Sequence, residues 1–337
     1  MRALVIKAPG QAEIASVREP TAADDHVLLR VQMVGLCGSD LNAFRGKNPM
    51  VSYPRIPGHE ISATIVESKA DRPDLAPGVN VTLSPYFNCG TCAACLRGRP
   101  NACQFNQTLG VQRDGALTEY ISVPASRLYT AKLSLKELCI VEPLTVGAHA
   151  ASRGRITSQD TVAILGCGGV GLGAIAAAHF RGARSIAIEL EEEKLQLACA
   201  VGASHAIRAG TGNLQQQLAG ITDGRGPDVV IEAIGTPETF RTAVEIVAST
   251  GRVVYVGWVK EPVAYETRLF VQKELDILGS RNALPEDFRE VIRMLEEHRF
   301  PVDAAVSSIV SLDDAPRALS DWSENPARVK KIMVQLT

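Results

Sequence analysis

One hexapeptide, from Gly166 to Gly171, constrains the fold of this 337-residue chain more than any other feature. It reads Gly-Cys-Gly-Gly-Val-Gly, so glycine occupies its first, third and sixth positions. An apolar run at 162–165 precedes it, and a second apolar run at 171–181 follows it. We interpret these runs as a strand and a helix joined by a tight turn, which is the context in which a GxGxxG pattern binds a dinucleotide. The glycines let the backbone approach a pyrophosphate at the positive end of the helix.

Glu189 follows the last of these glycines by eighteen residues, at the end of the next predicted strand. A carboxylate at this position accepts hydrogen bonds from the adenosine ribose and repels a 2′-phosphate. The next residues, Leu190-Glu191-Glu192, include no arginine that would bind such a phosphate. The sequence therefore predicts NAD rather than NADP, and the alternative is a doubly wound domain with a glycine turn and no nucleotide. The expected cofactor contacts are Gly166, Gly168, Gly169, Val170, Gly171 and Glu189.

Predicted strands and helices alternate from residue 161 onward. Besides the pair around the glycines, strands are predicted at 185–188, 228–234 and 252–256, and helices at 191–201 and 285–297. Regular alternation of this kind predicts a parallel sheet covered by helices.

Residues 1–140 have a different character. Short β-rich runs at 27–33, 60–67 and 79–83 are separated by frequent Pro and Gly, and a helical pattern begins only at 138–152. This first part therefore predicts a compact β domain or barrel. The fold class expected for the whole chain is α/β.

Charge and hydropathy exclude several classes of partner. Thirty-five basic and 37 acidic residues leave a net charge of −2, which gives no electrostatic reason to expect a nucleic acid or a membrane surface. The uncharged stretch 161–180 is as long as a membrane span, but its five glycines favour a strand, a turn and a helix. The N-terminus lacks the features of a signal peptide, so we expect a cytosolic protein.

Four of the eight cysteines form a tight cluster in sequence. Cys89, Cys92, Cys95 and Cys103 follow the pattern CxxCxxCx7C, which lets four thiolates converge on one metal ion from a single loop. We predict a structural zinc ion with no open position, and an iron–sulfur cluster or disulfides are the alternatives. The cysteines outside the pattern at 139, 167 and 199 lie in apolar or glycine-rich segments, and we expect them to be small buried residues.

A second set of metal ligands lies nearer the N-terminus. The segments Gly35-Leu36-Cys37-Gly38-Ser39-Asp40 and Gly58-His59-Glu60 supply a thiolate, an imidazole and a carboxylate. With the cysteine loop and the glycine pattern downstream, these segments resemble those of the zinc-containing medium-chain dehydrogenases, which include sorbitol, threonine and sugar-acid dehydrogenases. The resemblance extends over essentially the full chain, through Asp114 to Tyr120, Glu142-Pro143-Leu144 and Gly279-Ser280-Arg281-Asn282.

The resemblance implies a fold and a domain organisation. It implies a GroES-like catalytic domain over 1–146 with the structural zinc loop at 88–104, a Rossmann domain over 147–282, and a return to the catalytic domain over 283–337. It also implies further cofactor contacts, from Lys194, Gly235, Gly279, Ser280 and Arg281.

The resemblance also assigns roles at a catalytic zinc ion. Cys37 and His59 match its ligands, and either Glu60 or Glu142 supplies the third. Asp40 matches a carboxylate that orients the histidine, and the alternative for it is a turn cap after Gly38. Ser39 matches the hydroxyl that binds the reacting alcohol. The implied activity is the interconversion of a secondary alcohol and a ketone with NAD.

The sequence departs from the family at Asn42, where many relatives have a histidine that passes the substrate proton to solvent. An amide holds a water molecule but does not take up a proton at useful pH. We therefore expect the proton to leave through Ser39, the cofactor ribose and ordered water.

Substrate recognition is expected between the two ligand segments and at Arg113. Phe44, Arg45 and Arg113 are the candidate substrate residues, and one of the two arginines pairs with a substrate carboxylate if it is not simply a solvated surface charge. Segments 52–55 and 279–288 are similar to those of sugar-acid dehydrogenases, including bacterial galactonate 5-dehydrogenases. A sugar acid such as a hexonate ranks first, a neutral polyol second and threonine third.

Two other protein classes share this fold. A zinc-free quinone reductase does not need both cysteine segments, and a retired enzyme kept as a nucleotide-binding protein is expected to have lost a zinc ligand. The family resemblance further implies a homodimer or homotetramer. The apolar strand 252–256 and the following Gly257-Trp258 suit a subunit contact at a sheet edge, although an internal strand has the same pattern.

Overall fold

The computed structural model describes residues 1–325 and 329–336, which form two compact units. Unit 1 contains residues 1–142 and 302–337, and unit 2 contains residues 143–301. The boundaries expected from the sequence, at 146 and 282, stay a prediction about domains. The expected fold class, a GroES-like β domain and a Rossmann-type parallel sheet, is confirmed.

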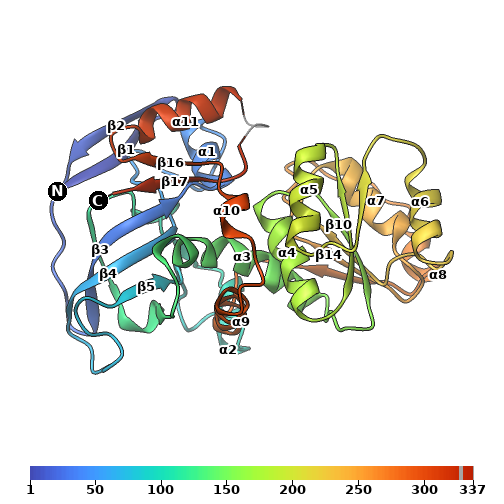
Figure 1. The fold of residues 1–337 in the computed structure, drawn as a ribbon, viewed down its shortest axis with the longest axis horizontal. Helices are drawn as coiled ribbons and strands as arrows, with labels where there is room; N and C mark the ends of the chain where they lie inside the picture. The colour runs from blue at the N-terminus through green and yellow to red at the C-terminus, as the bar shows by residue number, and fades with distance from the viewer. Residues whose placement is uncertain (326–328, 337) are drawn as a thin grey trace. The chain divides into compact units, whose positions relative to one another are not determined.

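Unit 1 is built around a seven-stranded sheet with the order β16-β17-β3-β4-β5-β9, in which β8 also pairs with β3. The long antiparallel pair β3–β4 forms its centre (Figure 1). Alternate residues of β3, such as Val27, Leu29 and Val31, are fully buried in the core of this unit. The strands are β1 (Arg2–Ala8), β2 (Gln11–Ser16), β3 (His26–Gly35), β4 (Glu60–Ser68), β5 (Asn80–Leu83), β6 (Tyr86–Phe87), β7 (Gln107–Thr108), β8 (Tyr120–Pro124), β9 (Leu128–Thr130), β16 (Ser308–Ser311) and β17 (Ile332–Gln335).

Short helices connect the strands of unit 1. They are α1 (Gly38–Phe44), α2 (Ala93–Leu96), the 3₁₀ turns η1 (Pro100–Ala102) and η2 (Ala125–Arg127), α10 (Val302–Ala305) and α11 (Ala315–Glu324). The long helix α3 (Leu135–Arg153) belongs to both units, because the boundary between them falls at Glu142 and Pro143 inside it. Pro143 has no backbone N–H, so one internal hydrogen bond of the helix is missing at this point.

Unit 2 is a six-stranded parallel sheet with the order β12-β11-β10-β13-β14-β15. Helices α4 and α5 lie on one face of the sheet, and α6, α7 and α8 lie on the other (Figure 1). Its elements are β10 (Thr161–Leu165), α4 (Gly169–Phe180), β11 (Arg184–Glu189), α5 (Glu192–Val201), β12 (His205–Arg208), α6 (Leu214–Ile221), β13 (Val229–Glu232), α7 (Pro237–Ile246), β14 (Arg252–Tyr255), α8 (Arg268–Gln272), β15 (Asp276–Gly279) and α9 (Pro285–Glu296).

Helix α9 belongs to unit 2 because polar side chains tie it to neighbouring helices of that unit. The Asp287 carboxylate lies 2.8 Å from Nδ1 of His149 in α3 and accepts a hydrogen bond from the Ser152 hydroxyl at 3.0 Å. The carboxylate of Glu290 forms an ion pair with Arg181 at the end of α4. These contacts explain why the compact unit extends beyond residue 282.

Two expectations from the sequence need correction. Strand β14 is internal, since it pairs with both β13 and β15, so the edge of the sheet is β15. Cys199 is exposed on α5, whereas Cys139 and Cys167 are buried as predicted.

The uncharged stretch 161–180 is divided into β10, the glycine turn and α4. Among the described residues, no helix is both long and apolar enough to cross a membrane.

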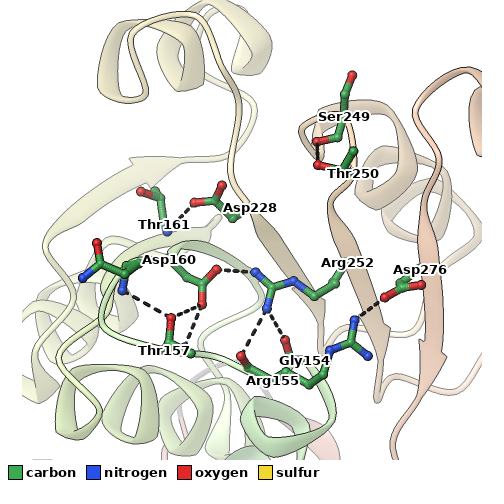
Figure 2. Close-up of polar contacts among 11 residues, drawn as sticks. Gly154, Arg155, Thr157, Asp160, Thr161, Asp228, Ser249, Thr250, Arg252 and Asp276 are labelled. Atoms are coloured by element: carbon green, nitrogen blue, oxygen red, sulfur yellow. Dashed lines mark hydrogen bonds and ion pairs between the residues drawn. The ribbon is translucent and has the colours of Figure 1, made fainter.

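A polar network closes the end of the parallel sheet at which β14 begins (Figure 2). The guanidinium of Arg252 forms an ion pair with Asp160 and donates to the carbonyl oxygens of Gly154 at 2.8 Å and Arg155 at 3.1 Å, just beyond α3. Asp160 also accepts hydrogen bonds from the backbone and hydroxyl of Thr157, at 2.7 and 3.0 Å. The side chains of Arg252 and Asp160 are only 17% and 10% exposed, so removing one of them leaves a buried charge without its partner.

We expect Arg252→Met to lower the free energy of unfolding by about 3 kcal/mol, because the Asp160 carboxylate stays buried without its counter-charge. Urea unfolding followed by circular dichroism measures this change. The matched control is Arg225→Met, which removes an ion pair with Asp223 whose side chains are 74% and 84% exposed, and which should change the free energy by less than about 0.5 kcal/mol. Equal losses in the two variants would contradict the role given to the network.

Candidate metal centres and nucleotide site

Four cysteine sulfurs converge in the loop between β6 and β7. The Sγ atom of Cys92 lies 3.6 Å from that of Cys95 and 3.8 Å from that of Cys103, and Cys103 lies 3.5 Å from Cys89. A tetrahedral zinc site with Zn–S bonds of about 2.3 Å places its sulfurs about 3.8 Å apart. The four side chains therefore fit one zinc ion, and they leave no open position for a substrate.

Backbone N–H groups donate to the sulfurs of Cys89 and Cys103. The N–H groups of Cys89 and Phe105 donate to Sγ of Cys103, both at 3.3 Å, and that of Cys92 donates to Cys89 at 3.3 Å. Hydrogen bonds from the backbone of Thr91 and Cys92 lower the pKa of Cys89 to about 6. Burial raises the pKa of Cys95 to about 11, so zinc, which binds thiolates, displaces a proton from that residue when it binds the loop.

The second cluster lies at the end of the central strand pair of the unit 1 sheet, where α1 follows β3 and where β4 begins. Cys37 precedes α1, His59 precedes β4, and Glu60 is the first residue of β4. Their ligand atoms all lie within 4.8 Å of one another. His59 and Glu60 are buried, at 6% and 1% exposure. A thiolate, an imidazole and a carboxylate that converge in this way suit a catalytic zinc ion with a position left for substrate.

The carboxylate of Asp40 joins the two segments that carry these ligands. One oxygen accepts the backbone N–H of Cys37 at 2.9 Å, and the other accepts that of Gly58 at 3.1 Å. Oδ1 of Asp40 also lies 3.8 Å from Nδ1 of His59, which has no hydrogen-bond partner among the described residues. The Asp40 carboxylate thus lies beside Nδ1 without a hydrogen bond to it, on the side from which a carboxylate orients a metal-binding histidine.

The charge of Asp40 also acts on the His59 ring. Burial alone would lower the pKa of His59, but the carboxylate of Asp40 and the thiol of Cys37 raise it well above its usual value. A metal ion binds neutral imidazole, so zinc displaces a proton when it binds this cluster.

Glu60 is held by a lysine that is distant in sequence. The ammonium of Lys331 donates to both carboxylate oxygens, at 2.6 and 2.7 Å, and to the carbonyl oxygen of Leu36 at 3.2 Å. Gly35 lies opposite Glu60 in the β3–β4 pair, and a Cβ atom there would approach Oε2 of Glu60 to 2.0 Å. Glycine at this position is therefore needed to accommodate the carboxylate.

Glu142, the alternative third ligand, receives a hydrogen bond from the hydroxyl of Tyr86. Burial raises the pKa of Glu142 to about 7. Burial and the nearby Glu142 charge raise the pKa of Tyr86 well above its usual value, so its hydroxyl stays protonated and donates. Glu142 does not belong to the group of three whose ligand atoms lie within 4.8 Å, and each of the two carboxylates has its own buried donor in Lys331 or Tyr86.

The two polar residues expected at the reacting alcohol lie one turn apart on α1. The hydroxyl of Ser39 is 3.5 Å from Nε2 of His59, so it lies beside the metal cluster. Asn42 is exposed on the same helix.

The residues expected to recognise the substrate are less closely connected to the metal cluster. Phe44 is buried in the core of unit 1. Arg45 is bound to Ser323 near the end of α11, with Nε donating to the hydroxyl at 3.0 Å. The exposed Arg113 lies over the ring of Phe87, 4.1 Å from its centre.

Unit 2 contains a pocket of about 650 Å³ at the carboxyl ends of its strands. Four of the predicted cofactor residues line it: Gly166, Gly168, Glu189 and Lys194. Glu189 accepts hydrogen bonds from the backbone N–H groups of Cys167 at 3.0 Å and Leu190 at 2.7 Å, so its carboxylate is fixed beside the glycine turn.

The remaining cofactor candidates surround the same glycine turn or follow β15. A Cβ atom on Gly171 would lie 1.8 Å from the carbonyl oxygen of Gly166, which explains the last glycine of the pattern. Gly169 and Val170 begin α4, and Gly235 ends the turn after β13 with φ +85°. Gly279 is the last residue of β15, and Ser280 and Arg281 follow it; the buried Ser280 hydroxyl has no hydrogen-bond partner among the described residues.

Sequence reasoning missed several residues of these sites. Lys331 and Tyr86 contact the two candidate carboxylate ligands, and Ile234, Arg208 and Thr239 line the nucleotide pocket. Lys331 is 271 residues from Glu60, so no local pattern connects them. The apolar residues of β17, which follow Lys331 directly, are the only local sign in the sequence that this part of the chain is buried.

Comparison with known proteins agrees with this arrangement. Residues 23–133 match the alcohol dehydrogenase GroES-like domain, and residues 169–297 match the zinc-binding dehydrogenase family. The chain is 33% identical to an uncharacterized zinc-type alcohol dehydrogenase-like protein of Haemophilus influenzae, over 98% of each chain. It is 32% identical to L-galactonate-5-dehydrogenase of Escherichia coli, over 90% of this chain and 89% of the relative.

A solved structure supports the same relationship. An alcohol dehydrogenase of Escherichia coli in complex with NADH superposes with a TM-score of 0.92 and 27% identity, covering 100% of this chain and 99% of the other.

We expect the purified protein to contain two zinc ions per chain and Cys103→Ser to contain one, because the four-sulfur loop then lacks a ligand. Inductively coupled plasma mass spectrometry of the dialysed protein measures the content. Cys199→Ser is the matched control, since Cys199 is exposed and belongs to neither cluster, and it should keep both ions. Two ions in Cys103→Ser would show that the loop is not a four-cysteine zinc site.

Proposed function

Because this chain belongs to the zinc-type medium-chain alcohol dehydrogenase family, which acts on CH–OH groups with NAD or NADP, we propose that it interconverts a secondary alcohol and a ketone on a sugar acid. The observation that carries the proposal is the convergence of Cys37, His59 and Glu60 in a chain whose second unit has a dinucleotide pocket. A family member that has lost its activity is not expected to keep all of its zinc ligands together with the carboxylate of Asp40 that orients the histidine.

Zinc and NAD supply the chemistry that the side chains lack. Zinc bound to the second cluster acts as a Lewis acid that favours ionisation of the alcohol near neutral pH, and NAD accepts the hydride. Two zinc ions per chain are proposed, one at the four-cysteine loop and one at this cluster. The third ligand of the second ion is Glu60 or Glu142, and the donors Lys331 and Tyr86 fix the orientation of the two carboxylates.

The side chains near the second cluster bind the substrate, position the metal ligands and form the proton path. Ser39 binds the substrate hydroxyl and takes part in removing its proton. Asp40 keeps the Cys37 and His59 segments in place through the backbone N–H groups of Cys37 and Gly58. Asn42, exposed one turn after Ser39, holds a water molecule in the proton path instead of carrying the proton itself. The pH–rate profile of Asn42→His tests this path, and an unchanged profile would argue against it.

NAD is proposed over NADP because of Glu189. Its carboxylate lines the pocket beside Gly166 and Gly168, where it repels a 2′-phosphate and accepts hydrogen bonds from ribose hydroxyls. The Escherichia coli relative of known structure was solved with NADH. A reducing compartment such as the cytosol suits a chain that keeps seven of its eight cysteines in the two clusters or buried in the core.

A sugar acid is the proposed substrate because of the similarity to L-galactonate-5-dehydrogenase, and Arg45 and Arg113 are the candidate partners of its carboxylate. Arg113 suits a substrate carboxylate better than Arg45. Arg113 is exposed above Phe87, whereas Arg45 already binds Ser323. A neutral polyol is the second candidate and threonine the third.

A homo-oligomer is proposed from the open edge of the parallel sheet. Strand β15 ends the sheet, with Ile277 exposed by 42%, and Val271 in the preceding helix is exposed by 83%. An edge strand with apolar neighbours invites pairing with a second copy. Size-exclusion chromatography with light scattering distinguishes monomer, dimer and tetramer, and a monomer would contradict this proposal.

The first test measures NADH formation at 340 nm with a panel of hexonates, polyols and threonine, with and without a chelator. We expect turnover of a hexonate that depends on NAD and is abolished by the chelator. Arg113→Met should raise KM for the hexonate about tenfold through the lost ion pair and leave any activity on the matching polyol unchanged. Turnover of polyols alone would contradict the sugar-acid proposal, and no turnover with any alcohol would contradict the enzymatic one.

The cofactor preference gives a second test. We expect Glu189→Ala to lower kcat/KM with NAD about tenfold to a hundredfold, since hydrogen bonds to a carboxylate are lost, and to leave kcat/KM with NADP unchanged or raised. Steady-state kinetics with both cofactors measures the ratio. Glu193→Ala on the exposed side of α5 is the matched control and should leave both values unchanged. An equal fall with both cofactors would show that Glu189 does not select NAD.

A further inference from the structure

Glu232, the last residue of β13, has a completely buried side chain. Its Oε1 atom accepts three hydrogen bonds, from the backbone N–H of Ile234 at 2.9 Å, that of Gly235 at 2.7 Å and the hydroxyl of Thr239 at 2.8 Å. A carboxylate is costly to bury without donors, and Oε1 has three of them, whereas Oε2 has no hydrogen-bond partner among the described residues. These three donors come from the turn after β13 and the first residues of α7, so the side chain folds this turn back over its own strand.

The same carboxylate lies under a second turn, the one that follows β14. The carbonyl oxygen of Glu232 accepts the N–H groups of Val256 at 2.9 Å and Gly257 at 3.0 Å. A Cβ atom on Gly257 would come within 2.3 Å of Oε2 of Glu232 and 2.4 Å of the backbone nitrogen of Gly235. The turns after β13 and β14 therefore pack backbone against backbone, with Glu232 between them.

The turn that Glu232 holds is part of the nucleotide pocket. Ala233, Ile234 and Thr239 line that pocket together with Gly166 and Glu189. Ile234 also packs on the glycine turn itself, because a Cβ atom on Gly166 would lie 2.6 Å from its Cγ1 atom.

The position of Glu232 in the sheet has a further consequence. The strand order reverses between β10 and β13, and ligands of parallel α/β sheets bind in the crevice at such a reversal. Two helices begin at this crevice, α4 after the glycine turn and α7 after the Glu232 turn. Glu232 places its own negative charge at the start of α7, which leaves the start of α4 as the end that favours the cofactor pyrophosphate.

We propose that Glu232 is a positioning residue for NAD(H), whose hydrogen bonds to Ile234, Gly235 and Thr239 fix the wall of the nucleotide pocket before the cofactor binds. The proposal rests on the proposed function, because it presumes that this pocket takes the dinucleotide. A pocket that is fixed in advance binds more tightly, since less order is lost on binding.

The test measures the Kd for NADH by its fluorescence. We expect Glu232→Met to raise this Kd at least about tenfold, because three donors lose their acceptor and the turn is released. In steady-state assays KM for NAD should rise while kcat at saturating NAD changes little. Glu232→Gln keeps an oxygen that accepts the same three hydrogen bonds, so its Kd should stay within about threefold of the wild-type value.

Two controls separate positioning from stability and from charge. Arg252→Met destabilises the same unit at the opposite end of the sheet and should leave the Kd for NADH unchanged at a temperature where it is folded. Glu232→Asp, which also serves if Glu232→Met does not fold, keeps the charge but withdraws it by one methylene, and it should raise the Kd. A Kd that rises equally in Arg252→Met, or that is restored by Asp and not by Gln, would overturn the positioning role.

The wild-type protein separates the two levels of the argument. If it binds NADH and Glu232→Met and Glu232→Asp bind it equally well, only the role of Glu232 fails. If the wild-type protein binds no NADH, the proposed cofactor fails together with it.

Discussion

The cluster of Cys37, His59 and Glu60 depends on the carboxylate of Asp40, which accepts hydrogen bonds from two backbone segments that are distant in sequence. Its two oxygens bind the N–H groups of Cys37 and Gly58, so the loop before α1 and the loop before β4 are joined by one buried group. A carboxylate suits this task because each oxygen accepts more than one hydrogen bond and charge strengthens each bond. The sulfur of Cys37 and the imidazole of His59 therefore converge through hydrogen bonds to the backbone.

A second constraint is the need to neutralise or hydrogen-bond two acidic side chains that are buried close to the metal cluster. Glu60 and Glu142 both lie in the interior of unit 1, and two carboxylates are unstable there without compensation. Lys331, the residue before β17, supplies the positive charge, and Tyr86 supplies a neutral donor. The segment that returns to unit 1 after the parallel sheet therefore contributes a residue to the metal centre.

The sequence predicts the parts of this protein that are encoded by local spacing. The cysteine loop and the glycine turn of unit 2 lie within short segments whose chemistry depends on few neighbours. Long-range partners are different: the pair of Lys331 with Glu60 depends on strand β17 lying beside β3, and the role of Glu232 depends on a turn after another strand. β15 was not predicted as a strand, because at four residues it is short and its exposed edge gives a weak apolar pattern.

Asp40 and Glu232 solve the same physical problem in the two units. Each is a buried carboxylate that accepts two backbone N–H groups, Asp40 through both oxygens and Glu232 through Oε1 alone, and each fixes a turn that carries ligand-binding atoms. Substitution of either residue is expected to lower the rate or the affinity even though neither contacts the substrate. A ligand-binding group displaced by one ångström costs far more rate or affinity than the loss of one surface contact. In both units a buried carboxylate thus holds, through backbone N–H groups, a turn that carries ligand-binding atoms.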